Sequence, residues 1–125
     1  MKRVLIAEDD ADTAAAIKAT LQEKLGVAVD DVTNGALVFD RIVAFSPDLI
    51  ILDVTLPGLN GLDVFDLIRG SERWEGPILF LTATPERARR AFARKGTREV
   101  MQKPFDLDAL AARVSSLLEN AARAA

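Results

Sequence analysis

The sequence predicts an α/β fold, in which helices cover both faces of a parallel β-sheet. Three short apolar runs, at residues 4–7, 49–52 and 78–81, are continuous rather than alternating, a pattern typical of strands buried on both faces. Between these runs lie segments whose apolar residues recur every three or four positions, as in amphipathic helices. Strands that alternate with helices favour a parallel sheet with right-handed crossover connections.

The three continuous runs predict central strands, and two mixed segments predict edge strands. Residues 27–32 are apolar except at Asp30 and Asp31, and residues 100–101 form a short apolar pair. Charged or weakly apolar strands suit the edges of a sheet. With the most apolar strands in the centre, the favoured strand order is 2-1-3-4-5, that of the flavodoxin-like fold, whose ligand crevice opens at the carboxyl ends of the first and third strands.

The first two predicted helices have recognisable ends. An acidic residue, Asp10 or Asp12, can cap the first helix, and Gly26 is a stop signal. The second helix ends before Pro47, because the residue preceding a proline disfavours the helical conformation. The apolar residues that repeat along these helices are Ile17, Leu21 and Leu25 in the first and Leu37, Ile42 and Phe45 in the second.

The other three helices are predicted from their first residues. Asn60 can cap the third, Thr84 precedes a proline at the first helical position of the fourth, and Asp106 opens the fifth. The chain is then expected to form one domain, residues 1–125, with its core at 2–118 and a short C-terminal helical tail at 119–125 that frays. Inward-facing residues are Val64, Phe65 and Ile68 in the third helix and Leu107, Leu110, Val114, Leu117 and Leu118 in the fifth.

The composition excludes several classes of function. The chain has no cysteine and no histidine, which excludes disulfides, thiolate or histidine metal sites and histidine acid–base catalysis. The net charge of −3 argues against direct nucleic-acid binding by the domain. Phosphate-binding motifs of the G-x-x-x-x-G-K and G-x-G-x-x-G types are absent. The apolar stretch near the N-terminus is too short for a signal peptide or membrane span, and we expect a cytoplasmic protein.

Polar residues follow four of the predicted strands at the edge where the crevice opens. Carboxylates at one edge of a sheet repel one another, and a bound cation relieves this repulsion. Because only oxygen ligands are available, Mg²⁺ is the ion we expect. Each residue taken singly is better explained as a helix cap or a solvated side chain, and Asp10 is expected to be one of these. Their convergence favours a site made of Glu8, Asp9, Asp53, Thr82 and Lys103.

Four motifs occur in order along the chain: "VLIAEDD", "DLIILDVTLPGLNGLDV", "ILFLTAT" and "MQKPF". In these motifs, and from Lys2 to about Leu118, the sequence resembles the receiver domains of two-component response regulators, the CheY-like superfamily. The resemblance implies a switch that is phosphorylated with the help of Mg²⁺. Such a domain is not an enzyme in the usual sense, since it catalyses only its own phosphorylation and dephosphorylation.

The resemblance also implies roles for individual residues. Asp53 would be the phosphoacceptor and one of the Mg²⁺ ligands. Asp9 would bind Mg²⁺ directly and Glu8 mainly through water. Thr82 and Lys103 would contact the phosphoryl oxygens. An aspartate is ionised at neutral pH and can attack phosphorus without a general base, so a phosphoacceptor site needs no histidine.

Further positions are implied around this site. The backbone carbonyl of Thr55 would be another Mg²⁺ ligand, the peptide bond between Lys103 and Pro104 would be cis, and Thr55 and Thr84 flank the site where the family tunes dephosphorylation. Val100 stands where most members carry Tyr or Phe. The usual coupling of the threonine to an aromatic ring is therefore in question. The signal could pass through the loop backbone or the fourth helix, or Val100 could be an ordinary edge-strand residue.

The implied partners are proteins. A sensor histidine kinase or a histidine phosphotransfer protein would donate the phosphoryl group, and a downstream protein would bind the face made by the fourth helix, fifth strand and fifth helix. A homodimer is also possible. The arginine-rich segment at residues 86–99, "ERARRAFARKGTRE", is favoured as a solvated helix face over a basic docking surface. No function is assigned to the single Trp74.

Two other functions are weighed against the phosphorylated receiver. A degenerate receiver would be a phosphorylation-independent interaction module, but all the matched site residues are present. A phosphohydrolase of the haloacid-dehalogenase type carries D-x-D, whereas the tripeptide here is Asp53-Val54-Thr55. A stand-alone regulator is favoured over a piece of a longer one, since the chain begins with Met and ends in an ordinary helix tail.

Overall fold

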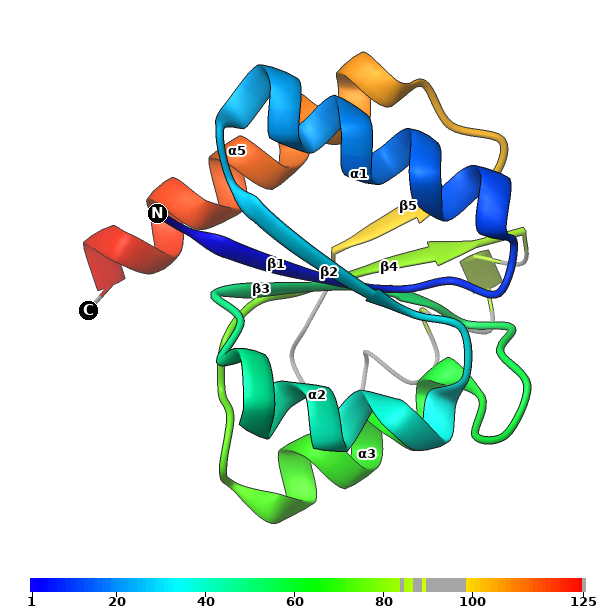
Figure 1. Ribbon diagram of the computed structural model, residues 1–125. Coiled ribbons are helices and arrows are strands. Elements are labelled where there is room, and N and C mark those ends of the chain that lie inside the picture. Colours follow the sequence, from blue (N-terminus) through cyan, green and yellow to red (C-terminus); the bar gives the residue numbers. More distant parts are fainter. Residues whose placement is uncertain (84, 87–88, 90–98, 125) are drawn as a thin grey trace.

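The protein is described here by a computed structural model that covers residues 1–83, 85, 86, 89 and 99–124 (Figure 1). Its five strands form one parallel sheet in the order β2-β1-β3-β4-β5, so the predicted topology is confirmed. The central strands are buried throughout apart from the first residue of β1, whereas the edge strands are partly exposed, as predicted. The strands are β1 (Arg3–Ala7), β2 (Ala28–Val32), β3 (Leu49–Asp53), β4 (Ile78–Thr82) and β5 (Val100–Gln102).

Four α-helices cover the sheet in the described part of the chain. Figure 1 shows α1 and α5 on one face and α2 and α3 on the other. The fourth helix predicted to open at Thr84 falls largely outside the described residues. Among described residues, no helix combines the length and apolarity needed to cross a membrane. The helices are α1 (Ala11–Leu25), α2 (Val38–Phe45), α3 (Gly61–Ser71) and α5 (Leu107–Ala124).

The helix ends confirm two predicted caps and correct one boundary. The carboxylate of Asp10 accepts hydrogen bonds from the Asp12 N–H and the Thr13 hydroxyl at the start of α1. The side chain of Asn60 caps α3 in the same way, at 3.0 Å from each of two backbone N–H groups. The second helix begins later than its apolar pattern indicates, at Val38, because a 3-10 turn, η1 (Gly35–Leu37), precedes it.

The sheet separates two apolar clusters, because successive strand residues point to opposite faces. One cluster packs α2 and α3 on the sheet, and in it the rings of Phe65 and Phe80 meet edge to face at 5.4 Å. The other packs α1 and α5 on the opposite face. Val100 lies beside Phe80 in the sheet and packs on the first cluster. Burial from both sides makes the central strands a firm base for their carboxyl-end residues.

Hydrogen bonds of Trp74 and Arg69 connect the loops at the amino ends of β3 and β4. The indole N–H of Trp74 donates to the carbonyl of Pro47 at 2.8 Å, which joins the loop before β4 to the loop before β3. The Arg69 guanidinium lies over the rings of Phe65 and Trp74 and donates to the carbonyls of Trp74 and Gly76. No role for Trp74 was predicted from its sequence context, and in the structure it connects two loops.

Candidate functional site

All five residues that the sequence predicted for the crevice lie at the carboxyl ends of the strands. Glu8 and Asp9 directly follow β1, Asp53 ends β3, Thr82 ends β4, and Lys103 directly follows β5. Backbone hydrogen bonds continue past the strand ends: the Glu8 N–H donates to Val32, and the Lys103 N–H donates to Thr82 at 2.8 Å. These bonds fix the backbone of the site residues to the sheet.

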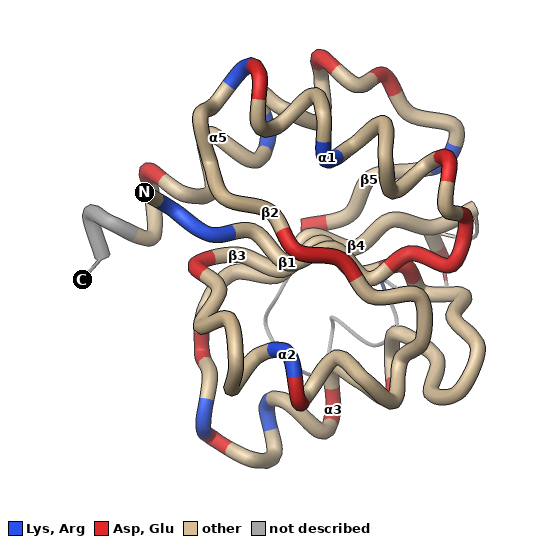
Figure 2. The backbone as a smooth tube through the Cα atoms, viewed as in Figure 1, with Lys and Arg blue, Asp and Glu red and all other residues tan. Residues whose placement is uncertain are grey.

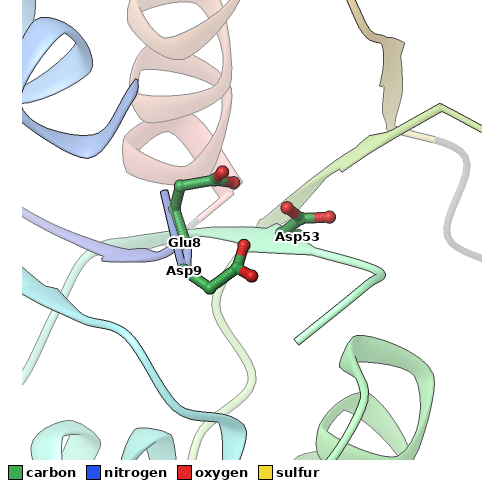
Figure 3. A group of neighbouring side chains, drawn as sticks. All are labelled: Glu8, Asp9 and Asp53. Atoms are coloured by element: carbon green, nitrogen blue, oxygen red, sulfur yellow. The ribbon is translucent and has the colours of Figure 1, made fainter. Parts of the chain in front are cut away.

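Three carboxyl groups form the centre of the site (Figure 3). One oxygen from each of Glu8, Asp9 and Asp53 lies within 4.8 Å of the other two. The Glu8 side chain is almost inaccessible, and the Asp53 residue is only 3 % exposed, whereas Asp9 is exposed to solvent. Buried carboxylates this close together repel one another unless a cation lies between or beside them.

Lys103 supplies positive charge to two of these carboxylates. Its ammonium lies 2.6 Å from Asp53 Oδ2 and 2.9 and 3.1 Å from the two oxygens of Glu8. Burial and the neighbouring Asp53 raise the pKa of Glu8 to about 7, although Lys103 acts in the opposite direction. Burial alone would lower the pKa of Lys103, but its bonds to Asp53 and Glu8 outweigh this and raise it. The buried negative charge therefore exceeds the charge that Lys103 can balance.

The acidic residues nearby on β2 differ from this cluster. Figure 2 shows acidic positions on β2 and on the segment that follows β1. Asp30 pairs with Arg41 at 3.5 Å, and Asp31 lies 3.9 Å from Lys18. Each of these two carboxylates pairs with one cationic side chain at an exposed or partly exposed position, which is typical of surface ion pairs. By contrast, the carboxylates of Glu8, Asp9 and Asp53 lie close together, and a single ammonium, that of Lys103, contacts two of them.

A cavity of about 790 Å³ opens beside the three carboxylates. The polar part of its wall comes from the acidic cluster, Thr55 and Lys103. Its other wall is largely apolar and comes from α1 and from residues 104–107; Pro104 and Phe105 lie in the motif "MQKPF", but the sequence did not indicate a cavity wall at these positions. That wall consists of Thr13, Ala16, Pro104, Phe105 and Leu107.

The remaining predicted positions have mixed outcomes. The peptide bond between Lys103 and Pro104 is cis, as expected. Thr82 is buried, with 1 % of its surface exposed, and Thr55 lines the cavity, where its N–H donates to Asp53 Oδ1 at 2.9 Å. Asp10 caps α1 as expected, although it also lines the cavity. Thr84 lies outside the described residues.

The donor set fits a hard divalent cation. Carboxylate oxygens converge from two adjacent strands, and the described residues near them offer no nitrogen or sulfur ligand apart from the ammonium of Lys103. Carboxylates with space for water are the ligands that Mg²⁺ and similar ions prefer. The acidic cluster could therefore hold a metal ion.

Comparisons with known proteins agree with this arrangement. Residues 4–115 match the family model described as "Response regulator receiver domain". The chain is 39 % identical over 116 residues to the response regulator protein PmrA of Pseudomonas aeruginosa, covering 92 % of this chain and 52 % of that protein. It is 38 % identical over 122 residues to the transcriptional regulatory protein PcoR of Escherichia coli, covering 97 % and 53 %. The chain thus spans about half the length of the curated relatives it matches.

Solved structures give the same result. The BeF3-activated N-terminal receiver domain of Klebsiella pneumoniae RstA superposes with a TM-score of 0.82 at 28 % identity, covering 94 % of this chain and 98 % of that one. The receiver domain of the Francisella response regulator 1452 superposes with a TM-score of 0.85 at 26 % identity, covering 96 % and 98 %. Family match, fold and the converging strand-end residues agree: this chain belongs to the response regulator receiver domains of two-component systems.

Proposed function

We propose that the domain is a phosphorylation switch in which Asp53 accepts a phosphoryl group. The observation that carries the proposal is the position of Asp53: its carboxylate lies at the end of a fully buried strand, beside Lys103 and within 4.8 Å of two other carboxylates. A nucleophile held this firmly satisfies the main demand of phosphoryl transfer, which is alignment.

Four groups of the chain would hold Mg²⁺: the carboxylates of Glu8, Asp9 and Asp53 and the backbone carbonyl of Thr55. A bound Mg²⁺ supplies positive charge to the phosphoryl oxygens during transfer. Its binding would also offset the repulsion among the carboxylates, which Lys103 balances only in part. Both oxygens of Glu8 accept from Lys103, and by analogy with other receivers we assign Glu8 to contact through water rather than direct ligation.

In the proposed transfer the donor is a phosphohistidine. A carboxylate oxygen of Asp53 attacks phosphorus, the new O–P bond forms as the P–N bond breaks, and the imidazole nitrogen keeps the electron pair. Lys103 already lies beside the attacking group and would donate to the phosphoryl oxygens, as would the buried hydroxyl of Thr82. The product is an acyl phosphate, which water hydrolyses, so the modification is temporary.

The proposed donors are a sensor histidine kinase or a histidine phosphotransfer protein, by analogy with other receivers. The downstream partner is assigned to the face that includes β5 and α5, with a homodimer as one form of that contact. The remainder of that face, the predicted fourth helix, falls outside the described residues. The description of the RstA receiver as BeF3-activated supports a receiver that changes state when its site is occupied. Phosphorylation would act by shifting the population between two states.

Incubation with acetyl phosphate and Mg²⁺, followed by intact mass measurement, tests the proposal. We expect the mass of one phosphoryl group to be added, and to be absent after Asp53→Asn or when EDTA replaces Mg²⁺. Asp40→Asn, at an exposed position of α2, is the matched control and should be modified like the unaltered protein. No added mass would favour the phosphorylation-independent module, and sustained hydrolysis of unrelated phosphoesters would favour a phosphohydrolase.

A further inference from the structure

The turn between β2 and α2 touches the loop that follows Asp53, and we infer that it is a positioning element for the cation site. In this inference Asn34 and Gly35 hold the loop of residues 54–60 in the place where Thr55 can serve as a ligand. The inference rests on the proposed function, because it concerns the affinity of the same site for Mg²⁺. Neither Asn34 nor Gly35 lines the cavity, so their effect is through the loop.

Backbone hydrogen bonds hold the loop of residues 54–60 at both ends, and its middle has no regular secondary structure. At one end the Val54 N–H donates to Leu81 at 3.0 Å, and at the other the Gly61 N–H donates back to Val54 at 2.9 Å. The residues between these anchors belong to no helix or strand. Thr55 lies at the start of this irregular stretch and lines the cavity beside Asp53.

The middle of the loop contacts the β2–α2 turn directly. The Gly35 N–H donates to the carbonyl of Pro57 at 3.0 Å. The amide oxygen of Asn34 is held in place by the Ala36 N–H at 2.8 Å. The two segments are thus joined by a hydrogen bond in the middle of the loop, between its two anchors.

The contact leaves no room for a methyl group on either side. A Cβ at Gly35 would lie 1.7 Å from the carbonyl oxygen of Leu59, and a Cβ at Gly58 would lie 2.0 Å from the amide oxygen of Asn34. Such separations must widen to at least 3.0 Å before atoms fit. Gly58 also has φ of 81°, a conformation that other residues seldom adopt. Alanine at Gly35 must therefore push the loop away from the turn.

A shifted loop pulls on Thr55, which directly follows the Val54 anchor and is itself held by the bond from its N–H to Asp53 Oδ1. Groups that orient metal ligands from outside the ligand set typically change metal affinity by about 10- to 100-fold when altered. We therefore expect Gly35→Ala to weaken Mg²⁺ binding about tenfold or more, while the carboxylates of the site stay in place on their strands. Phosphorylation of Asp53 should then need more Mg²⁺ for half its maximal rate and recover when Mg²⁺ is saturating.

The test is calorimetric titration with Mg²⁺ alone, on the unaltered protein and on matched glycine variants. Gly26 has φ of 63° and open space around it, at the end of α1 remote from Asp10. Gly26→Ala should thus lower thermal stability by backbone strain without changing Mg²⁺ affinity. Gly70, on α3, also has open space around it, and Gly70→Ala should raise thermal stability slightly, because alanine favours a helix more than glycine does, and leave Mg²⁺ affinity unchanged. A loss of Mg²⁺ affinity confined to Gly35→Ala supports the inference.

A double-mutant cycle keeps the inference testable if Gly35→Ala does not fold. Gly58→Ala places a methyl group against Asn34, and Asn34→Ala removes the amide that it would strike. The double variant should therefore bind Mg²⁺ several-fold more tightly than Gly58→Ala alone. Independent effects of the two substitutions on affinity would overturn the inference.

The other outcomes separate the inference from the proposed function. If the unaltered protein binds Mg²⁺ and Gly35→Ala binds it equally well, the positioning role is wrong and the proposed function stands. If Gly26→Ala weakens binding as much as Gly35→Ala does, the effect is one of stability and the positioning role is again wrong. If the unaltered protein binds no Mg²⁺, both fail.

Discussion

The two edges of the sheet are built in opposite ways. At the carboxyl edge, Glu8 and Asp53 are buried beside an open cavity and share one ammonium group. At the amino edge, Arg69 and Trp74 direct their N–H groups to nearby backbone carbonyls and pack their planar groups on apolar neighbours. The amino edge satisfies its polar groups locally, whereas the carboxyl edge keeps excess negative charge.

This difference separates stability from function within one sheet. Buried polar groups with complete hydrogen bonding stabilise a fold, while crowded carboxylates lower its stability unless a cation is bound. Sites with such unfavourable charge are typical of binding and catalysis, where stability is lost in exchange for activity. Substitutions at the carboxyl edge should therefore change phosphorylation most, and substitutions at the amino edge should change stability most.

The largest effect is expected at Lys103, which serves the carboxyl edge alone. Lys103→Ala should slow phosphoryl uptake from acetyl phosphate by about 100-fold or more at saturating Mg²⁺, the range found when one charge-stabilising donor is removed from an active site. The rate is measured by intact mass over time. Lys24→Ala removes an exposed lysine that pairs with Asp108 on α5 and should leave the rate unchanged. Equal rates in all three proteins would refute the role of Lys103.

The second prediction concerns Trp74 and should change stability alone. Trp74→Ala should lower the free energy of unfolding by about 2 to 3 kcal/mol, less than for a fully buried tryptophan, because the ring is only partly buried. Trp74→Phe keeps part of the packing but loses the N–H bond to Pro47, and should lower it by about 1 kcal/mol. Denaturant unfolding measures both. A slower phosphoryl uptake by the folded variants would contradict the separation of the two edges.

The third prediction concerns the pH dependence that Glu8 gives to the stability of the metal-free protein. The pKa of Glu8 is about 7 in the fold, where Asp9, Asp53 and Lys103 surround it, against 4.5 ordinarily. The folded state then holds the proton more tightly than the unfolded chain, so the Glu8 contribution to stability falls as pH rises from about 4.5 to about 7. Glu8→Gln removes this dependence.

In EDTA, the stability of Glu8→Gln relative to the unaltered protein should therefore increase between about pH 5 and about pH 8. Thermal unfolding across that range measures the difference. Glu119→Gln, at an exposed position of α5, should show a constant difference. Added Mg²⁺ should stabilise the unaltered protein more than Glu8→Gln, since a ligand stabilises only the state that binds it. If the thermal stabilities of Glu8→Gln and the unaltered protein changed with pH in parallel, the raised pKa of Glu8 would be wrong.

Local patterns in the sequence predicted most of the sheet and the site. Continuous apolar runs identified the central strands, and the residues directly after them identified the strand-end cluster, because parallel strands end at the same edge. Asp10 and Asn60 were predicted as caps from residue type and position alone. In each case the determining interactions lie within a few residues or follow from strand direction.

The features that the sequence did not reveal depend on contacts between distant segments. Trp74 bonds to Pro47, 27 residues away, and Gly35 contacts Leu59 across the loop. No local pattern marks either contact, since tryptophan in a polar loop and glycine in a turn are both ordinary. The later start of α2 has a similar origin: the contact of Gly35 with Pro57 holds the turn before the helix.

The position of Trp74 has a practical consequence for spectroscopy. The chain has one tryptophan and no tyrosine, so its intrinsic fluorescence comes almost entirely from a single indole at the edge of the sheet away from the carboxylates. That signal should follow the loss of the folded state and stay silent when an ion arrives. Ion titrations of this receiver therefore need heat or an introduced dye as their readout, and the natural emission remains available as an independent monitor of folding in the same cuvette.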